Sequence, residues 1–91
     1  MTKAVKAVVS GQVQGVGFRQ ATRSTARSFN LWGWVRNVWG EGTVEVWLQG
    51  EPEAVDRMLD WLWIGPSLAE VSGVESEVVA LDRYLQDFLI R

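Results

Sequence analysis

The chain has 91 residues, of which 47% are hydrophobic and 22% are charged, as is typical of one small globular domain. It contains no cysteine and no histidine, which excludes disulfides, thiolate or imidazole metal sites, cysteine nucleophiles and a histidine general base. The net charge of −2 is unevenly distributed, because residues 1–40 contain six basic residues and no acid. This distribution indicates either an anionic partner for the first part of the chain or attraction between its two parts.

The pattern of apolar residues predicts a strand, a loop and a helix in the first third of the chain. Val5, Ala7 and Val9 alternate in a strand over residues 3–10, and three glycines follow within residues 11–17. From Phe18 the apolar residues recur at helical spacing, and Asn30 is a plausible helix stop.

Two strands and a second helix are predicted next, because residues 32–39 and 43–49 have strand patterns and flank the turn Gly40-Glu41-Gly42. Pro52 opens the second helix, which Gly65-Pro66 ends.

Residues 71–79 predict a fourth strand, and residues 88–91 a short final one. The order βαββαβ indicates an α+β fold, the ferredoxin-like sandwich, with an antiparallel sheet and both helices on one face. We expect residues 1–91 to form a single domain. No segment has the length and hydropathy of a membrane span or a secretion signal, so a cytoplasmic location is expected.

The first candidate binding segment is Gly11-Gln12-Val13-Gln14-Gly15-Val16-Gly17-Phe18-Arg19. A glycine-rich loop can direct several N–H groups into one concavity, and a helix N-terminus adds free donors and partial positive charge. An arginine adds a planar fork that matches phosphate oxygens. The segment therefore predicts a site for a phosphate-sized anion, although the glycines could also serve only a tight turn, with Arg19 solvated.

The second candidate segment is Gly33-Trp34-Val35-Arg36-Asn37, in which an asparagine lies near the end of a predicted strand. Asparagine favours turns, so Asn37 could simply begin the hairpin turn. A fixed amide also offers a donor and an acceptor, which together can orient a water molecule.

Together, GQVQGVGFR at 11–19 and GWVRN at 33–37 resemble the signatures of the acylphosphatase family. The resemblance covers essentially the whole chain and implies the same βαββαβ fold. It implies hydrolysis of small-molecule acyl phosphates to a carboxylate and inorganic phosphate, without a metal or an organic cofactor. By position, Arg19 would be the essential phosphate-binding arginine and Asn37 would orient the attacking water. The phosphate-binding loop would comprise Gln12, Val13, Gln14, Gly15, Val16, Gly17 and Phe18.

The chain departs from the family pattern in two places. Position 12 is glutamine, where the family often has a basic residue. The turn after Asn37 is about one residue longer than usual and carries Trp39, which could tune substrate access or be a harmless variation. Arg23 and Arg27 are expected to be solvated residues of the first helix.

Six tryptophans are unusual for a chain of this length. Strand alternation places Trp32, Trp34 and Trp47 on the open face of the sheet, away from the helices. They could stabilise the sheet under the tail at 81–91, mediate self-association of a chain otherwise expected to be monomeric, or form a non-enzymatic nucleic-acid-binding surface. The pI near 5.0 argues against nucleic acid as a partner.

A second alternative lies closer to the family itself. Acylphosphatase-like domains also occur at the front of hydrogenase-maturation carbamoyltransferases, which handle carbamoyl phosphate. The length of 91 residues favours the stand-alone enzyme.

Overall fold

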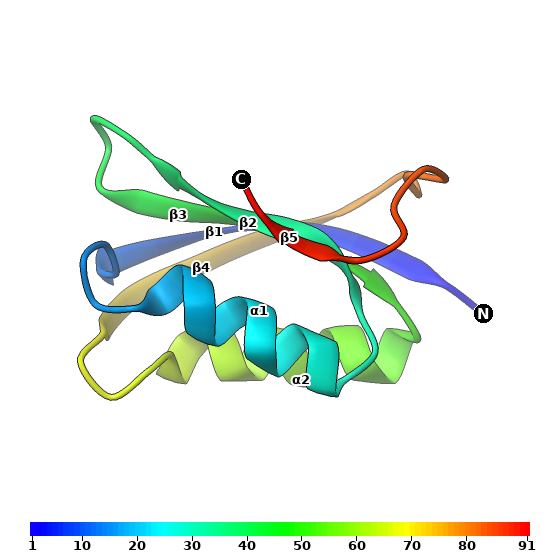
Figure 1. Ribbon diagram of the computed structural model, residues 1–91, viewed down its shortest axis with the longest axis horizontal. Helices are drawn as coiled ribbons and strands as arrows, with labels where there is room; N and C mark the ends of the chain where they lie inside the picture. Colours follow the sequence, from blue (N-terminus) through cyan, green and yellow to red (C-terminus); the bar gives the residue numbers. More distant parts are fainter.

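The computed structural model describes all 91 residues and has the predicted order of elements (Figure 1). Each boundary lies within two residues of its prediction. Gly65 ends the second helix with a positive φ of 66°, as its position in the sequence predicts. The elements are β1 (Lys3–Gln12), α1 (Phe18–Ser28), β2 (Trp32–Val38), β3 (Thr43–Gly50), α2 (Pro52–Ile64), β4 (Glu70–Val79) and β5 (Phe88–Ile90).

The helix α1 ends through backbone hydrogen bonds, which explains the role of Asn30. Leu31 donates its N–H to the carbonyl of Ala26, and Asn30 donates to Arg27. Asn30 takes a left-handed φ of 58°, as this type of helix end requires. The chain therefore turns sharply enough to enter β2 at once.

The sheet has the strand order β4-β1-β3-β2-β5, and its four long strands are antiparallel, as predicted. The short strand β5 differs, because it pairs with β2 in parallel. β4 ends at the same end of the sheet at which β2 begins. Residues 80–87 run across the sheet at this end, from β4 at one edge to the opposite edge beside β2. The strand β5 therefore starts at the same end as β2 and runs parallel to it.

Both helices cover one face of the sheet and enclose a single core (Figure 1). Alternate residues of the strands point into this core, and helical residues three or four apart meet them. The predicted buried stripes are confirmed. They comprise Val5, Ala7, Val9, Val35, Val44, Val46 and Leu48 from the sheet and Phe18, Ala26, Val55, Met58 and Leu62 from the helices.

The opposite face of the sheet carries Trp34 and Trp47, as predicted. Trp34 and Trp47 lie opposite each other on neighbouring strands and stack with their ring centroids 6.2 Å apart. The guanidinium of Arg91 lies 5.3 Å from the centroid of Trp34. The tail also reaches β3, where Gln49 exchanges hydrogen bonds with the backbone of Asp82. This face is therefore partly covered from within the chain.

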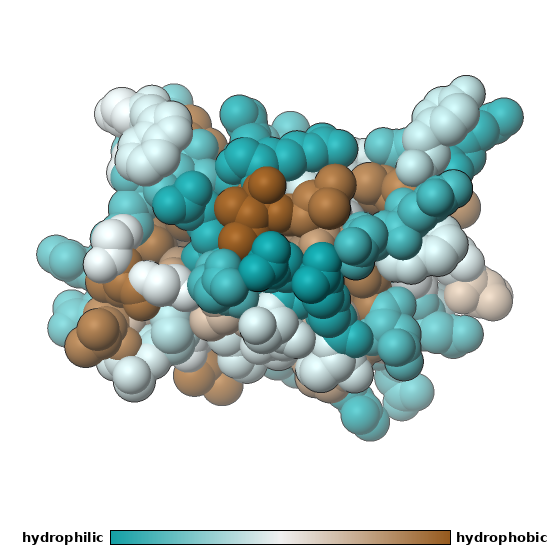
Figure 2. Space-filling view, in the orientation of Figure 1, coloured by the Kyte–Doolittle hydropathy of each residue, from teal (hydrophilic) through white to brown (hydrophobic).

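Figure 2 shows the face of the molecule that contains β5 and α1. It is largely polar, with a narrow apolar strip over β5. No helix is long and apolar enough to cross a bilayer.

Candidate active site

The loop between β1 and α1 has a backbone that forms a concavity. Gly15 and Gly17 have positive φ values of 74° and 79°, whereas Val16 between them has a negative φ. Alternation of this kind turns successive N–H groups toward one point, as in anion-binding nests. A Cβ at either glycine would meet no atom within 4 Å, so these positions require glycine for its backbone conformation alone.

The N-terminus of α1 opens toward the same concavity. Its first residues follow Gly17, no side chain caps them, and the first turn contains no acid. The N–H groups of this turn therefore remain available to a ligand, and the helix dipole favours a negative one.

Three apolar side chains fix the loop to the core. Val13 and Phe18 are buried at its two ends, and Val16 packs against the core cluster. Phe18 also lies against Gly65, where an added Cβ would approach its ring to 2.8 Å. The loop is thus held in shape before any ligand binds, which is the condition for a preorganised site.

The side chain of Gln14 joins the loop to the hairpin of β2 and β3. Its Nε2 donates hydrogen bonds to the carbonyl oxygens of Val38, at 3.3 Å, and Thr43, at 2.9 Å. These two residues stand on either side of the turn at residues 39–42. The amide therefore fixes the loop relative to the end of β2, where Asn37 lies.

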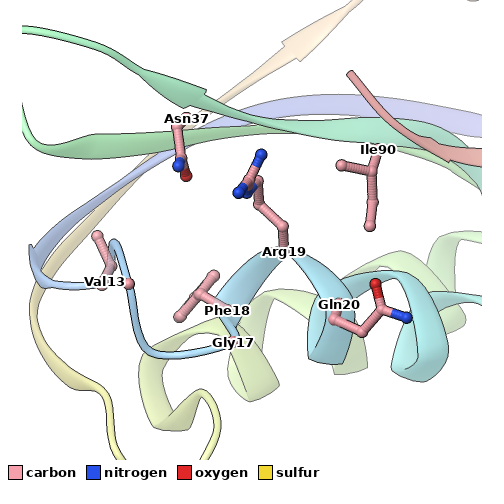
Figure 3. Close-up of a pocket in the computed structure, with 8 residues that line it drawn as sticks. Val13, Gly17, Phe18, Arg19, Gln20, Asn37 and Ile90 are labelled. Atoms are coloured by element: carbon pink, nitrogen blue, oxygen red, sulfur yellow. The ribbon is translucent and has the colours of Figure 1, made fainter.

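Arg19 and Asn37 meet in one cavity of about 220 Å³ between the loop, α1 and the sheet. Figure 3 shows both side chains directed into the space above the loop. The cavity is smaller than the roughly 300–1,000 Å³ typical of sites for drug-sized ligands, so it suits a small anion. Its wall comprises Val13, Gly15, Gly17, Phe18, Arg19, Gln20, Asn37 and Ile90.

The amide of Asn37 has an unpaired acceptor beside this cavity. Asn37 is 7% exposed, and its Oδ1 is buried without a hydrogen-bond partner. A buried polar atom without a partner is unfavourable by about 1–3 kcal/mol, so a donor is needed at this point.

Ion pairs account for most of the basic residues in the first forty. Acids from the second part of the chain pair with four of the six: Lys3 with Asp56, Lys6 and Arg36 with Glu45, and Arg27 with Asp87. Arg19 and Arg23 have no such carboxylate. The two parts of the chain therefore attract each other in this fold, while Arg19, beside the glycine-rich loop, has no carboxylate partner.

A model of the acylphosphatase family matches residues 5–90. The chain belongs to the acylphosphatase family. It is an enzyme that hydrolyses acyl phosphates, with a small-molecule acyl phosphate as substrate and inorganic phosphate as product. It is 45% identical to an acylphosphatase of Nitrosococcus oceani over the full length of both chains.

The structure is also similar to those of solved acylphosphatases. The acylphosphatase from Coxiella burnetii matches with a TM-score of 0.93 and 39% identity over 99% of this chain and 93% of that one. The acylphosphatase from Bacillus subtilis gives 0.92 at 27% identity over 100% and 99%. Full-length HypF in its phosphate- and nucleotide-bound form gives 0.87 at 26% identity, covering this whole chain but 12% of that one.

The sequence-predicted loop residues divide into two groups in the structure. Val13, Gly15, Gly17 and Phe18 contribute to the cavity wall. Gln12 instead ends β1 and pairs with Glu70, Gln14 points to the hairpin, and Val16 packs on the core.

Two residues of the wall, Gln20 and Ile90, were not singled out from the sequence. Gln20 follows Arg19 on the first turn of α1 without a motif of its own. Ile90 reaches the wall because β5 pairs with β2, a contact for which the local sequence carries no signal.

Arg27 is an exposed residue of α1, as expected, but its guanidinium also contacts the tail. Its Nη2 donates to Asp87 Oδ2 and to the carbonyl oxygen of Phe88, each at 3.1 Å. The N–H of Phe88 donates to the carboxylate of Asp87 and, with Arg27, holds the pKa of Asp87 below its usual value. Arg27 thus fixes the start of β5, the strand that supplies Ile90.

Proposed function

We propose that the phosphoryl group of the substrate is bound by the loop N–H groups and the Arg19 guanidinium, and that Asn37 orients the attacking water. The observation that carries this proposal is the convergence of Arg19 with the buried, unpartnered Oδ1 of Asn37 in one cavity. A water molecule that donates to Oδ1 directs a lone pair away from Asn37, toward a phosphoryl group held at Arg19.

The proposed reaction requires no base from the protein. The water oxygen forms the new P–O bond, and the P–O bond to the acyl oxygen breaks with its electron pair, releasing the carboxylate. The proton of the water passes to a phosphoryl oxygen of the substrate. No carboxylate lies in the cavity wall to accept it, and no three side chains of the types that ligate metals come together anywhere in the chain.

Catalysis then arises from positioning and from stabilisation of charge. Negative charge in phosphoryl transfer is spread over the phosphoryl oxygens, which fixed N–H groups and a guanidinium can stabilise. The fork of Arg19 contacts two oxygens at once, which a lysine ammonium cannot reproduce. Because the proposed reaction takes no proton from the protein and gives none to it, the rate should follow the ionisation of the substrate.

The test is hydrolysis of acetyl phosphate by the wild type and by variants at the two positions, with inorganic phosphate as a competitive inhibitor. Arg19→Ala and Arg19→Lys should lose phosphate inhibition and about 100-fold or more in kcat/KM. Asn37→Ala should retain the inhibition constant within about twofold and lose about 100-fold in kcat. Arg57→Ala, which removes an exposed arginine of α2, serves as the matched control and should change neither.

Two results would contradict the proposal. Full turnover by Asn37→Ala with unchanged phosphate inhibition would remove the role of Asn37 in orienting water. A kcat limb near neutral pH that persists when the ionisation of the substrate is held constant would require a titrating group of the protein.

We further propose that residues 1–91 act as one domain and as a monomer that does not bind nucleic acid. One cluster of buried residues, with members from both helices and from β1, β2, β3 and β5, supports the single domain. The stacking of Trp34 on Trp47 supports the monomer, since these rings already have partners. Glu45 on the same face opposes a nucleic-acid backbone.

A further inference from the structure

A second hollow lies on the open face of the sheet, on the other side of β2 from the cavity. It has a volume of about 600 Å³, and its wall includes Trp34, Arg36, Asn37, Trp39 and Arg91. Asn37 therefore belongs to the walls of both spaces. The hollow differs from the cavity in its larger volume and in its two indole rings, which lie among the charged side chains of Lys6, Arg36, Glu45 and Arg91.

The two spaces lie on either side of β2 and share Asn37 as a wall residue. The strand β5 pairs only with Gly33–Val35 and ends at Ile90, so the edge of β2 beyond Val35 has no neighbouring strand. Ile90 lines the cavity, whereas the next residue, Arg91, lines the hollow. A substrate bound through its phosphate at Arg19 can thus extend past this open edge into the hollow.

Trp39 is a wall residue of the hollow that also lies close to Arg19 of the cavity. It lines the hollow, and the guanidinium carbon of Arg19 lies 5.8 Å from the centroid of its ring. The ring is nevertheless 73% exposed, an unusual environment for a tryptophan. The bonds of Gln14 to Val38 and Thr43 fix the base of the turn that carries Trp39.

We propose that this hollow is the subsite for the acyl group and that Trp39 selects planar aromatic acyl groups over small aliphatic ones. The inference rests on the proposed function, because the position of the phosphate fixes where the acyl group begins. An aryl ring that stacks on Trp39 buries exposed indole surface and gains an aromatic contact. A methyl group is too small to do either, so the preference depends on the ring.

The experiment compares benzoyl phosphate with acetyl phosphate. Trp39→Ala should lower kcat/KM for benzoyl phosphate about five- to tenfold and change that for acetyl phosphate by less than about twofold. Trp39→Phe should restore most of the preference because it keeps an aromatic face. Trp63→Ala, which removes another exposed tryptophan on the polar side of α2, should leave both substrates unchanged.

Two outcomes would overturn the inference. An equal loss for both substrates in Trp39→Ala would mean that the ring acts only through Arg19, and no loss for either would mean that the hollow is unused. The proposed function is tested separately, since acetyl phosphate has no ring. Full turnover of acetyl phosphate by Arg19→Ala would refute the proposed function, whatever the Trp39 variants show about benzoyl phosphate relative to acetyl phosphate.

Discussion

Glu45 is shared by two cations on the open face of the sheet, and we expect its replacement by glutamine to destabilise the protein in a pH-dependent way. Its carboxylate accepts a hydrogen bond from Arg36 Nε at 2.7 Å and pairs with Lys6 Nζ at 3.1 Å. The side chain is nearly buried, at 11% exposure, whereas Arg36 and Lys6 remain 48% and 37% exposed.

The expected loss follows from these exposures. A hydrogen bond to a charged group contributes about 1.5–3 kcal/mol where all its partners are buried. Here the two cations can return to water when the carboxylate is removed, so the pairs are partly screened. We therefore expect Glu45→Gln to lower the free energy of unfolding by about 1–2 kcal/mol at neutral pH. For a domain of this size, that loss corresponds to a fall in Tm of roughly 5–15 °C.

The effect should disappear in acid. Burial alone would raise the pKa of Glu45, but the hydrogen bonds and charges of Arg36 and Lys6 outweigh it and hold the pKa below its ordinary value. A lowered pKa contributes stability that is complete above the ordinary glutamate pKa of about 4.3 and is lost as pH falls through the lowered value. The gap between the wild type and Glu45→Gln should therefore narrow as pH falls below the ordinary glutamate value and close only below the lowered pKa.

Urea unfolding at several pH values measures this gap. Glu41→Gln provides the control, because Glu41 is an exposed acid in the turn of the same hairpin and has no ion pair; its effect should stay within about 0.5 kcal/mol. Equal stability of Glu45→Gln and the wild type at neutral pH, or a gap of the same size in acid, would refute the reasoning.

Two further substitutions test the loop and the tail. Gly17→Ala should lower the free energy of unfolding by about 1–2 kcal/mol and weaken phosphate inhibition, because only its positive φ of 79° opposes a side chain. The control, Gly73→Ala, is at an open position without a positive φ and should be neutral in urea unfolding. Arg27→Ala removes the hydrogen bond to the carbonyl of Phe88 and should speed hydrogen exchange of the Arg91 amide about fivefold, with no change in β1. The Arg91 amide reports on β5 because it donates to the carbonyl of Val35 in β2. An unchanged exchange rate at Arg91 would show that β5 does not depend on Arg27.

Much of the fold could be predicted from the sequence because it depends on local periodicity. The alternation of Val44, Val46 and Leu48 and the helical spacing of Val55, Met58 and Leu62 directly indicate which residues are buried. The parallel pairing of β5 could not be predicted in this way, since it depends on where residues 80–87 cross the sheet. The register shift between Ser10 and Gly11 in β1 is also a property of the pairing with β4.

The site divides in the same way. The resemblance of two short segments was enough to name Arg19 and Asn37, which the structure brings into one cavity. The contacts of Gln14 with the hairpin and of Arg27 with the tail join residues 24 to 61 positions apart in the sequence. Such contacts depend on tertiary packing, so no spacing rule within a single element could reveal them.

The two hydrogen bonds of Gln14 have a consequence for how this enzyme can vary. They connect the loop to Val38 and Thr43, at the base of the turn, and leave residues 39–42 outside the connection. Changes in the length or composition of this turn therefore need not move Asn37 or the loop. The hairpin thus has a fixed base beside Asn37, to which we assign the orientation of water, and a tip on which substrate preference can evolve independently.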